Sequence, residues 1–250
     1  STFTPKTIPA HGNASFNQWA TTASIRVRHV KTSVLIKGEE LDPVDSTVFL
    51  GITLDAKLQW APHVNKLSKR LSSAAYAVKK IRNLTDVNTA RLVYFSYFHS
   101  IMSYGILLWG NAADIQSVFV LQKRAIRSIY NLSPRHSLRE LFKEINILTV
   151  PSQYIYENVV YAHKNINLFK KYCDIHNINT RSKNKYIVPT TRLKKISGSF
   201  RCQCIRFYNK IPSDIQSLSL NKFKNVIKEK LYSKAFYKIK DYLDDSQAWE

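Results

Sequence analysis

The first sixty residues carry the short hydrophobic patterns of β-strands. Residues 25–30 alternate apolar and polar side chains, residues 33–36 form a short β-branched run, and residues 47–54 form a second β-rich run. Alternation with a period of two is typical of a strand that buries one face. The pattern therefore predicts a small β-hairpin or meander, an incomplete piece of a larger sheet.

From residue 62 onward the hydrophobic positions recur every three or four residues, which is the period of an α-helix. Their stripe consists of Val64, Leu67, Leu71, Ala74 or Ala75, Val78 and Ile81. The other faces of this predicted helix carry the basic residues Lys66, Lys69, Arg70, Lys79, Lys80 and Arg82. The pattern predicts one helix that packs an apolar stripe on a core and exposes basic side chains.

Further helical patterns fill most of the remaining chain. The predicted helices cover residues 88–103, 114–130, 151–172, 199–209 and 221–241. Asp114 is a suitable N-cap, and the spacing of Ser137 and Glu140 is that of a capping box, which predicts one more helix start. Residues 173–198 are polar, basic and aperiodic, which is typical of a linker or long loop. The chain is therefore predicted to be mainly α-helical.

The predicted helix over 88–103 is crowded with the aromatic residues Tyr94, Phe95, Tyr97 and Phe98, and the helix over 114–130 contributes Phe119. Their neighbourhood is uncharged, so we expect them to form core and not a surface that stacks on bases. The C-terminal turns of the helix over 114–130 carry Lys123, Arg124 and Arg127, where positive charge also suits the helix dipole.

The net charge of the chain is +21, from 38 Lys and Arg against 17 Asp and Glu. The excess is largest over residues 157–240, which contain 19 basic and 4 acidic residues. Such a surface attracts nucleic-acid phosphate, with anionic lipid as the alternative. The longest uncharged stretch, 92–113, contains Ser, His and Gly residues that suit a buried helix better than a membrane span. We expect nucleic acid as the partner and no membrane.

Three cysteines at irregular spacing do not form a disulfide framework, which favours a reducing, intracellular location in the nucleus or the cytoplasm. Cys173 with His176, and Cys202 with Cys204, approach the spacing of zinc ligands. However, Cys-x-Cys is a short spacer, and its side chains diverge on a helix. Structural thiols are the favoured interpretation, so the sequence predicts no metal site.

Three groups of motifs follow one another along residues 41–245. The first is Phe49-Leu50-Gly51-Ile-Thr-Leu-Asp55-x-x-Leu58-x-Trp60-x-x-His63-Val64. The second comprises Tyr104-Gly105-Ile-Leu-Leu-Trp109-Gly110 and Leu121-Gln122-Lys123-Arg124-Ala-Ile-Arg127. The third comprises His176-Asn-Ile-Asn-Thr180-Arg181, Phe207-Tyr208-Asn209-Lys210-Ile211-Pro212 and Phe223-Lys224. In this order they resemble the end of the palm, the thumb and the C-terminal tail of reverse transcriptases from non-LTR (LINE-type) retrotransposons, the jockey-like group in particular.

The resemblance implies a division into a β-rich remnant of the palm, a helical thumb-like domain, and a basic C-terminal linker with helices, over residues 1–60, 61–172 and 173–250. Phe49, Leu50 and Gly51 take the place of the primer grip of that family. Gly51 has no Cβ, so its backbone can approach a primer closely. Thumb helices would hold the template–primer duplex by its shape and phosphates. The residues expected to do so are Lys66, Lys69, Arg70, Lys79, Lys80, Arg82, Lys123, Arg124 and Arg127.

The fingers, the aspartate motifs of the palm and the endonuclease of that family have no counterpart in this sequence. The tetrapeptide Tyr242-Leu243-Asp244-Asp245 has the composition of the family's metal-binding turn, but it ends a Lys-rich segment without flanking apolar strands. We expect it to be an acidic helix end. The resemblance then implies a C-terminal fragment that is inactive alone and contains no catalytic residue, metal site or cofactor, whereas the full-length enzyme uses Mg²⁺.

Expected partners are RNA and DNA, as template–primer, and the missing polymerase portion. The alternative function is a non-catalytic helical interaction module that binds a protein partner or structured RNA. Salt dependence separates the two, because phosphate binding weakens steeply with salt and an apolar protein interface does not.

Overall fold

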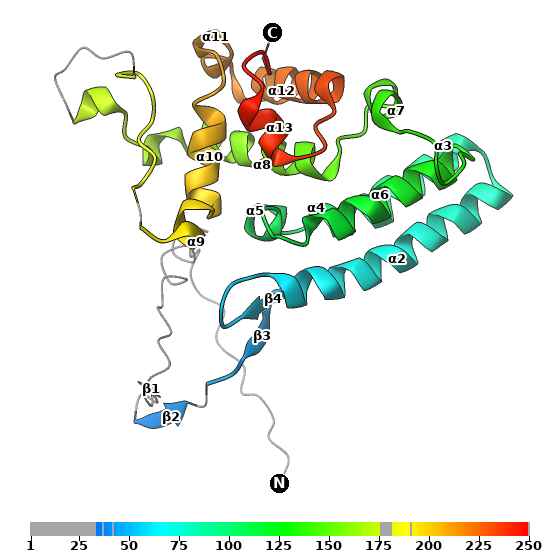
Figure 1. Ribbon diagram of the computed structural model, residues 1–250, viewed down its shortest axis with the longest axis horizontal. Helices are drawn as coiled ribbons and strands as arrows, with labels where there is room; N and C mark the ends of the chain where they lie inside the picture. Colours follow the sequence, from blue (N-terminus) through cyan, green and yellow to red (C-terminus); the bar gives the residue numbers. More distant parts are fainter. Residues whose placement is uncertain (1–33, 37, 42, 176–181, 191, 250) are drawn as a thin grey trace. The chain divides into compact units, whose positions relative to one another are not determined.

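The computed structural model describes residues 34–36, 38–41, 43–175, 182–190 and 192–249, which Figure 1 draws in colour. The chain divides into two compact units, Ser1–Ser46 and Thr47–Glu250. The strand predicted over 25–30 lies outside the described residues. So do His176, Thr180 and Arg181 of the third motif group.

In the first unit, β1 (Val34–Ile36) pairs antiparallel with β2 (Glu39–Leu41). Val34 lies opposite Leu41 and Ile36 opposite Glu39, so the pair is a short hairpin. Gly38 in the turn has a φ of 84°, a conformation that glycine adopts without a steric cost. The strand predicted over 33–36 is thus confirmed, whereas β2 had no clear signal in the sequence.

The β-rich run over 47–54 is two strands and not one. β3 (Ser46–Phe49) and β4 (Ile52–Asp55) form a second two-stranded sheet, joined by Leu50 and Gly51. In the described part of the chain, the strands therefore form two separate hairpins, and helices make up most of the structure. This confirms the predicted fold class, a mainly α-helical chain with a small N-terminal β-element.

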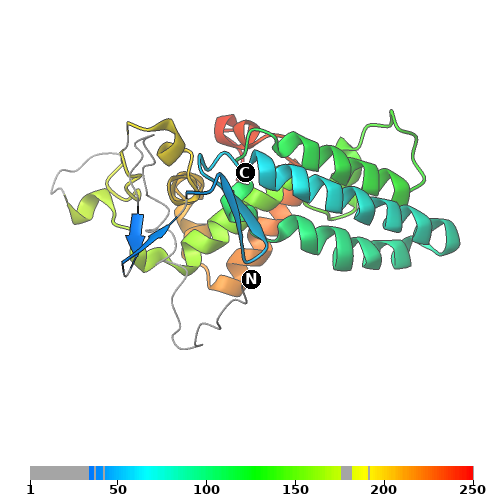
Figure 2. The same ribbon diagram turned by 90° about the horizontal axis from the view of Figure 1, so that it is seen from below.

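The first group of helices consists of α2 (Ala61–Leu84), α3 (Val87–Val93), the π-helical η1 (Tyr94–His99), α4 (Ser100–Ser103), α5 (Ile106–Trp109) and α6 (Ile115–Ile129). In this group, the long helix α2 packs against the consecutive elements α3, η1 and α4 and against α6. Figures 1 and 2 show α2, the run from α3 to α4, and α6 lying side by side. The predicted apolar stripe of α2 is buried from Val64 to Val78, which confirms that helix, and Ile81 is half-buried.

The second group is centred on α8 (Val150–Lys164), which packs against α10 (Phe200–Tyr208) and α12 (Leu220–Lys234). Its other helices are α7 (Arg139–Glu144), α9 (Lys194–Ser197), α11 (Ser213–Gln216) and α13 (Ile239–Asp244). Two 3₁₀ turns, η2 (Ile166–Leu168) and η3 (Tyr172–Asp174), follow α8.

One contiguous hydrophobic core joins the two groups, from Val64 in α2 to Trp249 after α13. The domain boundaries predicted at residues 60 and 172 stay a prediction. Within Thr47–Glu250 the described residues pack around one contiguous hydrophobic core.

Buried Gln122 connects three elements of this core. Its Nε2 donates to the Tyr94 hydroxyl at 3.0 Å and to the Leu148 carbonyl at 2.8 Å, and its Oε1 accepts from the Val150 N–H at 2.9 Å.

The helix starts predicted at Asp114 and near Ser137 are present, but their capping contacts differ from the prediction, and one predicted helix is interrupted. Glu140 lies inside α7, which begins at Arg139 with Leu138 as the N-cap, so Ser137 opens no capping box. Asp114 occupies the N-cap position of α6, but its side chain makes no capping hydrogen bond. The helix predicted over 221–241 is interrupted at Ala235, whose φ of 44° ends α12. Local spacing cannot show which cap the tertiary packing uses.

The aromatic cluster around η1 is only partly core. Tyr94 and Phe98 are fully buried, as predicted, but Phe95 and Tyr97 are exposed. The π-helical turn changes which side chains face α2 and α6, and a simple 3.6-residue period does not reveal such a turn. No helix in the described ranges combines the length and apolar character that a membrane span requires.

Candidate functional site

The tip of the β3–β4 hairpin has a strained backbone. Leu50 and Gly51 have φ values of 47° and 77°, the two positive angles of a type I′ turn. Glycine adopts this conformation freely, but leucine does so at a cost of about 1–3 kcal/mol. Phe49 and Leu50 are also exposed, Leu50 by 71%. The tip therefore presents apolar side chains from a backbone that its surroundings must hold in place.

The second motif group holds this tip. The Tyr104 hydroxyl donates a hydrogen bond of 2.6 Å to the Leu50 carbonyl, and the Tyr104 carbonyl accepts one of 3.0 Å from the Trp109 indole N–H. Gly105 has a φ of 64°, and a Cβ there would lie 2.7 Å from Ile52 Cδ1. Two motifs about fifty residues apart in sequence thus form one structural contact.

The first motif also contains the residues that fix the hairpin to α2. The carboxylate of Asp55 accepts from the N–H groups of Gln59 and Trp60 at 2.9 and 3.0 Å, which shapes the turn into the helix. The N–H of Thr53 donates to Nδ1 of buried His63 at 3.3 Å. The His63 ring lies 5.9 Å from the Trp109 ring. Much of this motif therefore positions the hairpin on the helices.

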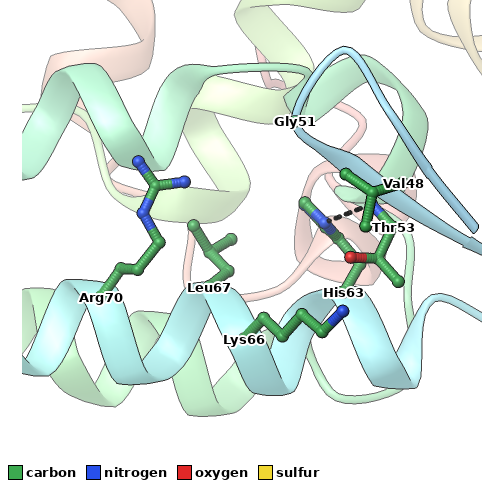
Figure 3. A pocket seen from close by; sticks show the side chains of 7 residues that line it. All are labelled: Val48, Gly51, Thr53, His63, Lys66, Leu67 and Arg70. Carbon is green, nitrogen blue, oxygen red and sulfur yellow. Dashed lines mark hydrogen bonds between the residues drawn. The ribbon is translucent and has the colours of Figure 1, made fainter. Parts of the chain in front are cut away.

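A small hollow lies between the hairpin and α2, and Figure 3 shows the side chains that line it. We call it the cationic hollow; its volume is about 140 Å³, and its lining residues are Val48, Gly51, Thr53, His63, Lys66, Leu67 and Arg70. Burial, with Arg70 and Lys66 as further causes, lowers the pKa of His63 below its usual value. In the described part of the chain, neither Lys66 nor Arg70 forms an ion pair.

A second hollow of about 370 Å³ shares Gly51 and Arg70 with the first. We call it the tyrosine hollow; its other lining residues are Leu50, Ser100, Ile101 and Tyr104. A Cβ on Gly51 would lie 3.7 Å from Tyr104 Cε1, an ordinary contact. The space around position 51 therefore does not exclude a Cβ atom there. The positive φ is the reason that a glycine suits this position.

The basic residues predicted from the sequence differ in how available their charges are. The exposed ones are Lys66, Lys69, Arg70, Lys79 and Lys80 on α2, and Arg124 on α6. Lys80 Nζ lies 5.5 Å from the centre of the Tyr76 ring. Lys66 and Arg70 are one helical turn apart and lie at the hairpin, so the structure brings them together with Gly51.

Three of the predicted residues bind protein groups instead. The Arg82 guanidinium donates to the Ile129 and Thr85 carbonyls at 2.8 and 3.0 Å. The Arg127 guanidinium donates to the His136 carbonyl at 3.0 Å. Lys123 Nζ lies 4.7 Å from the centre of the Phe119 ring, and burial, followed by Arg127, lowers its pKa. These side chains have structural contacts that spacing along a helix does not reveal.

The tetrapeptide at the end of the chain lies where we expected it, at a helix end. Tyr242 is buried in α13, and its hydroxyl donates to the Phe207 carbonyl at 3.0 Å. Lys210 Nζ donates to the carbonyls of Tyr242, Leu243 and Asp245 at 2.7–2.9 Å. The Asp245 carboxylate lies 3.9 Å from Lys234 Nζ.

The described residues contain no group of three or more His, Cys, Asp or Glu side chains that could hold a metal ion. Cys202 and Cys204 are buried, Cys173 is exposed, and all three are free thiols. His176, the fourth member of the zinc arrangement considered from sequence, lies outside the described residues.

Comparison with known proteins finds one informative relative. Over 129 residues, 50% of this chain, the sequence is 30% identical to the "Probable RNA-directed DNA polymerase from transposon BS" of Drosophila melanogaster. The match spans only 14% of that protein's length. No protein-family model matches the chain, and no solved structure matches it. The relative confirms the resemblance to the reverse transcriptase of a retrotransposon.

Proposed function

We propose that this chain is the primer-side and thumb portion of a non-LTR retrotransposon reverse transcriptase of the jockey-like group. In this proposal the hairpin tip and α2 bind template–primer nucleic acid, and the chain contributes no catalytic aspartate. The observation that carries the proposal is the position of Lys66 and Arg70. They form no ion pair in the described part of the chain, and they lie beside a strained, exposed hairpin tip that Tyr104 holds.

Each part of this arrangement suits a nucleic-acid backbone. Lysine and arginine side chains without acidic partners release counterions when they bind phosphates. A turn at Gly51 lets the backbone approach a sugar–phosphate chain. Contacts of this kind read shape and charge and not base sequence, which is what a polymerase requires of the residues that hold its duplex.

The direct test is duplex binding as a function of salt. We expect the chain to bind an RNA–DNA hybrid with a primer end, with log K falling linearly as log salt rises from 50 to 200 mM. The double variant Lys66→Ala/Arg70→Ala should reduce the magnitude of that slope by about 1.8, because each phosphate contact contributes about 0.9.

The matched control removes the same charge elsewhere. Lys222 and Lys240 are exposed lysines of α12 and α13, and Lys222→Ala/Lys240→Ala should leave the slope nearly unchanged. Equal losses in the two double variants would show that only net charge matters, and the proposed interface would be wrong. In a primer-extension assay with Mg²⁺ we expect no synthesis by this chain alone; any robust synthesis would contradict the non-catalytic part of the proposal.

A second candidate is a helical module that binds a protein partner. The observation in its favour is the exposure of two large apolar side chains, Leu84 at the end of α2 by 81% and Leu92 in α3 by 70%. Binding through these residues would change little with salt and would be lost in Leu84→Ser/Leu92→Ser. Duplex binding with a steep salt slope would favour the first function.

A further inference from the structure

The connection between α6 and α7 exposes a serine that is followed by a proline. Residues 130–138 lie between the two helices, and residues 133–137 are all exposed. The ring of Pro134 has no N–H group and fixes its own φ, so it offers an apolar surface directly after Ser133. Proline-directed protein kinases select a serine in this position, because their pocket for the following residue is apolar.

A hydrogen-bonded turn joins this serine to the end of α6. The N–H of His136 donates to the Ser133 carbonyl at 3.1 Å, and the N–H of Leu132 donates to the Arg127 carbonyl at 2.9 Å. The Arg127 guanidinium returns to the same turn, since its Nε and Nη2 donate to the His136 carbonyl at 3.3 and 3.0 Å. Ser133 and the Arg127 guanidinium are therefore both bonded to one residue, His136.

The charges around the turn suit an added phosphate. Residues 115–139 contain no Asp or Glu, and their basic residues are Lys123, Arg124, Arg127, Arg135 and Arg139. The next acid along the chain, Glu140, forms an ion pair of 2.9 Å with Lys143. An arginine has five N–H donors, so Arg127 keeps donors for a further acceptor beside the turn. A doubly charged group on Ser133 would meet positive charge without an acidic competitor in this stretch.

We propose that Ser133 is a phosphorylation site for a proline-directed serine kinase, and that Arg127 binds the phosphate. In the transfer, the bond between the γ-phosphorus of ATP and its bridging oxygen breaks, and a bond from Ser133 Oγ to that phosphorus forms. ADP leaves, and the hydroxyl proton goes to a carboxylate of the kinase. The phosphoserine has a charge of about −1.5 to −2 at pH 7 and three acceptor oxygens. Bonded to Arg127, it fixes the connection to the end of α6.

This proposal does not depend on the proposed nucleic-acid function, because Ser133 belongs neither to the hairpin tip nor to α2. The experiment incubates the whole chain with a proline-directed serine/threonine kinase, ATP and Mg²⁺, and maps the phosphate by mass spectrometry. We expect phosphate on Ser133. Thr4, which also precedes a proline, is counted separately. Absence of phosphate at Ser133 would overturn the site.

Two variants test whether the proline defines the site. Pro134→Ala should slow the modification of Ser133 by about ten-fold or more, because an enzyme pocket loses an apolar contact. Ser137 is exposed in the same connection but precedes Leu138, so Ser137→Ala is the matched control and should be modified as fast as the unmodified chain. An equal rate in Pro134→Ala and the unmodified chain would contradict the proposal.

Urea unfolding tests the role of Arg127. Phosphorylation should raise the urea midpoint of the unmodified chain, because the phosphate gains a charge-assisted hydrogen bond. The rise should be lost in Arg127→Ala and kept in Arg201→Ala, at an exposed arginine of α10. Each variant is compared with its own unphosphorylated form, so any stability that Arg127→Ala itself removes cancels. An equal rise in both variants, or no rise in the unmodified chain, would overturn the contact with Arg127.

Discussion

The hydroxyl of Tyr104 donates a 2.6 Å hydrogen bond to the carbonyl of Leu50, at the tip of a hairpin that lies 54 residues earlier in the chain. This bond connects the first and second of the three motif groups that carry the resemblance to reverse transcriptases. It also holds a leucine with a φ of 47°, a conformation that the residue alone disfavours. The proposed binding tip is therefore positioned by a residue outside the hairpin.

Tyr104→Phe should loosen the tip and leave the fold intact. Both groups are exposed, so water can replace the lost bond, and the stability cost should be less than about 1 kcal/mol. Hydrogen exchange of the Gly51 amide should speed up, and duplex affinity should fall. Tyr97→Phe, at another exposed tyrosine, is the control and should change neither quantity. Unchanged exchange in Tyr104→Phe would contradict the positioning role.

Gly105→Ala should destabilise the protein by about 1–3 kcal/mol, measured by urea unfolding. The new Cβ would lie 2.7 Å from Ile52 Cδ1, and the φ of 64° disfavours any side chain. Ile52→Val removes that Cδ1 atom, so in a double-mutant cycle it should recover the steric part of the loss. Full additivity of the two substitutions would show that the Ile52 contact is not the cause.

The stability of the protein should fall as pH drops below about 6.5, the ordinary pKa of histidine in the unfolded chain. The pKa of His63 is lowered in the folded state, so the unfolded chain binds more protons in this range and is favoured by acid. His63→Gln keeps an acceptor for Thr53 and should reduce the difference between urea midpoints at pH 7.5 and pH 5.5. His99 and His163, whose pKa values are also lowered by burial, account for the dependence that remains.

Gln122→Leu should cost about 2–5 kcal/mol of folding stability, because the Leu148 carbonyl and the Val150 N–H would lose their buried partner. Thermal or urea unfolding measures the effect. Gln116 lies exposed on the same helix, so Gln116→Leu is a matched control and should stay within about 0.5 kcal/mol of the parent. Similar costs at both positions would indicate a general effect of leucine on α6.

The sequence by itself determined the helices whose apolar stripes are regular. The stripe from Val64 to Val78 predicts α2 because a helix repeats every 3.6 residues, which is a local property of the chain. The order of the motifs also determined the resemblance that the transposon relative confirms. The helical pattern also predicted that basic side chains lie on the exposed faces of α2, which holds for five of the six, all but Arg82.

Only the tertiary structure decided which of these residues act together. It buries His63 against Thr53, joins Tyr104 to Leu50, and gives Arg82 and Arg127 backbone carbonyls as partners. It also places Arg70 between two hollows at the hairpin tip. A hydrogen bond forms only between groups that are close in space. Residues about fifty positions apart in the chain come close only when the core has formed.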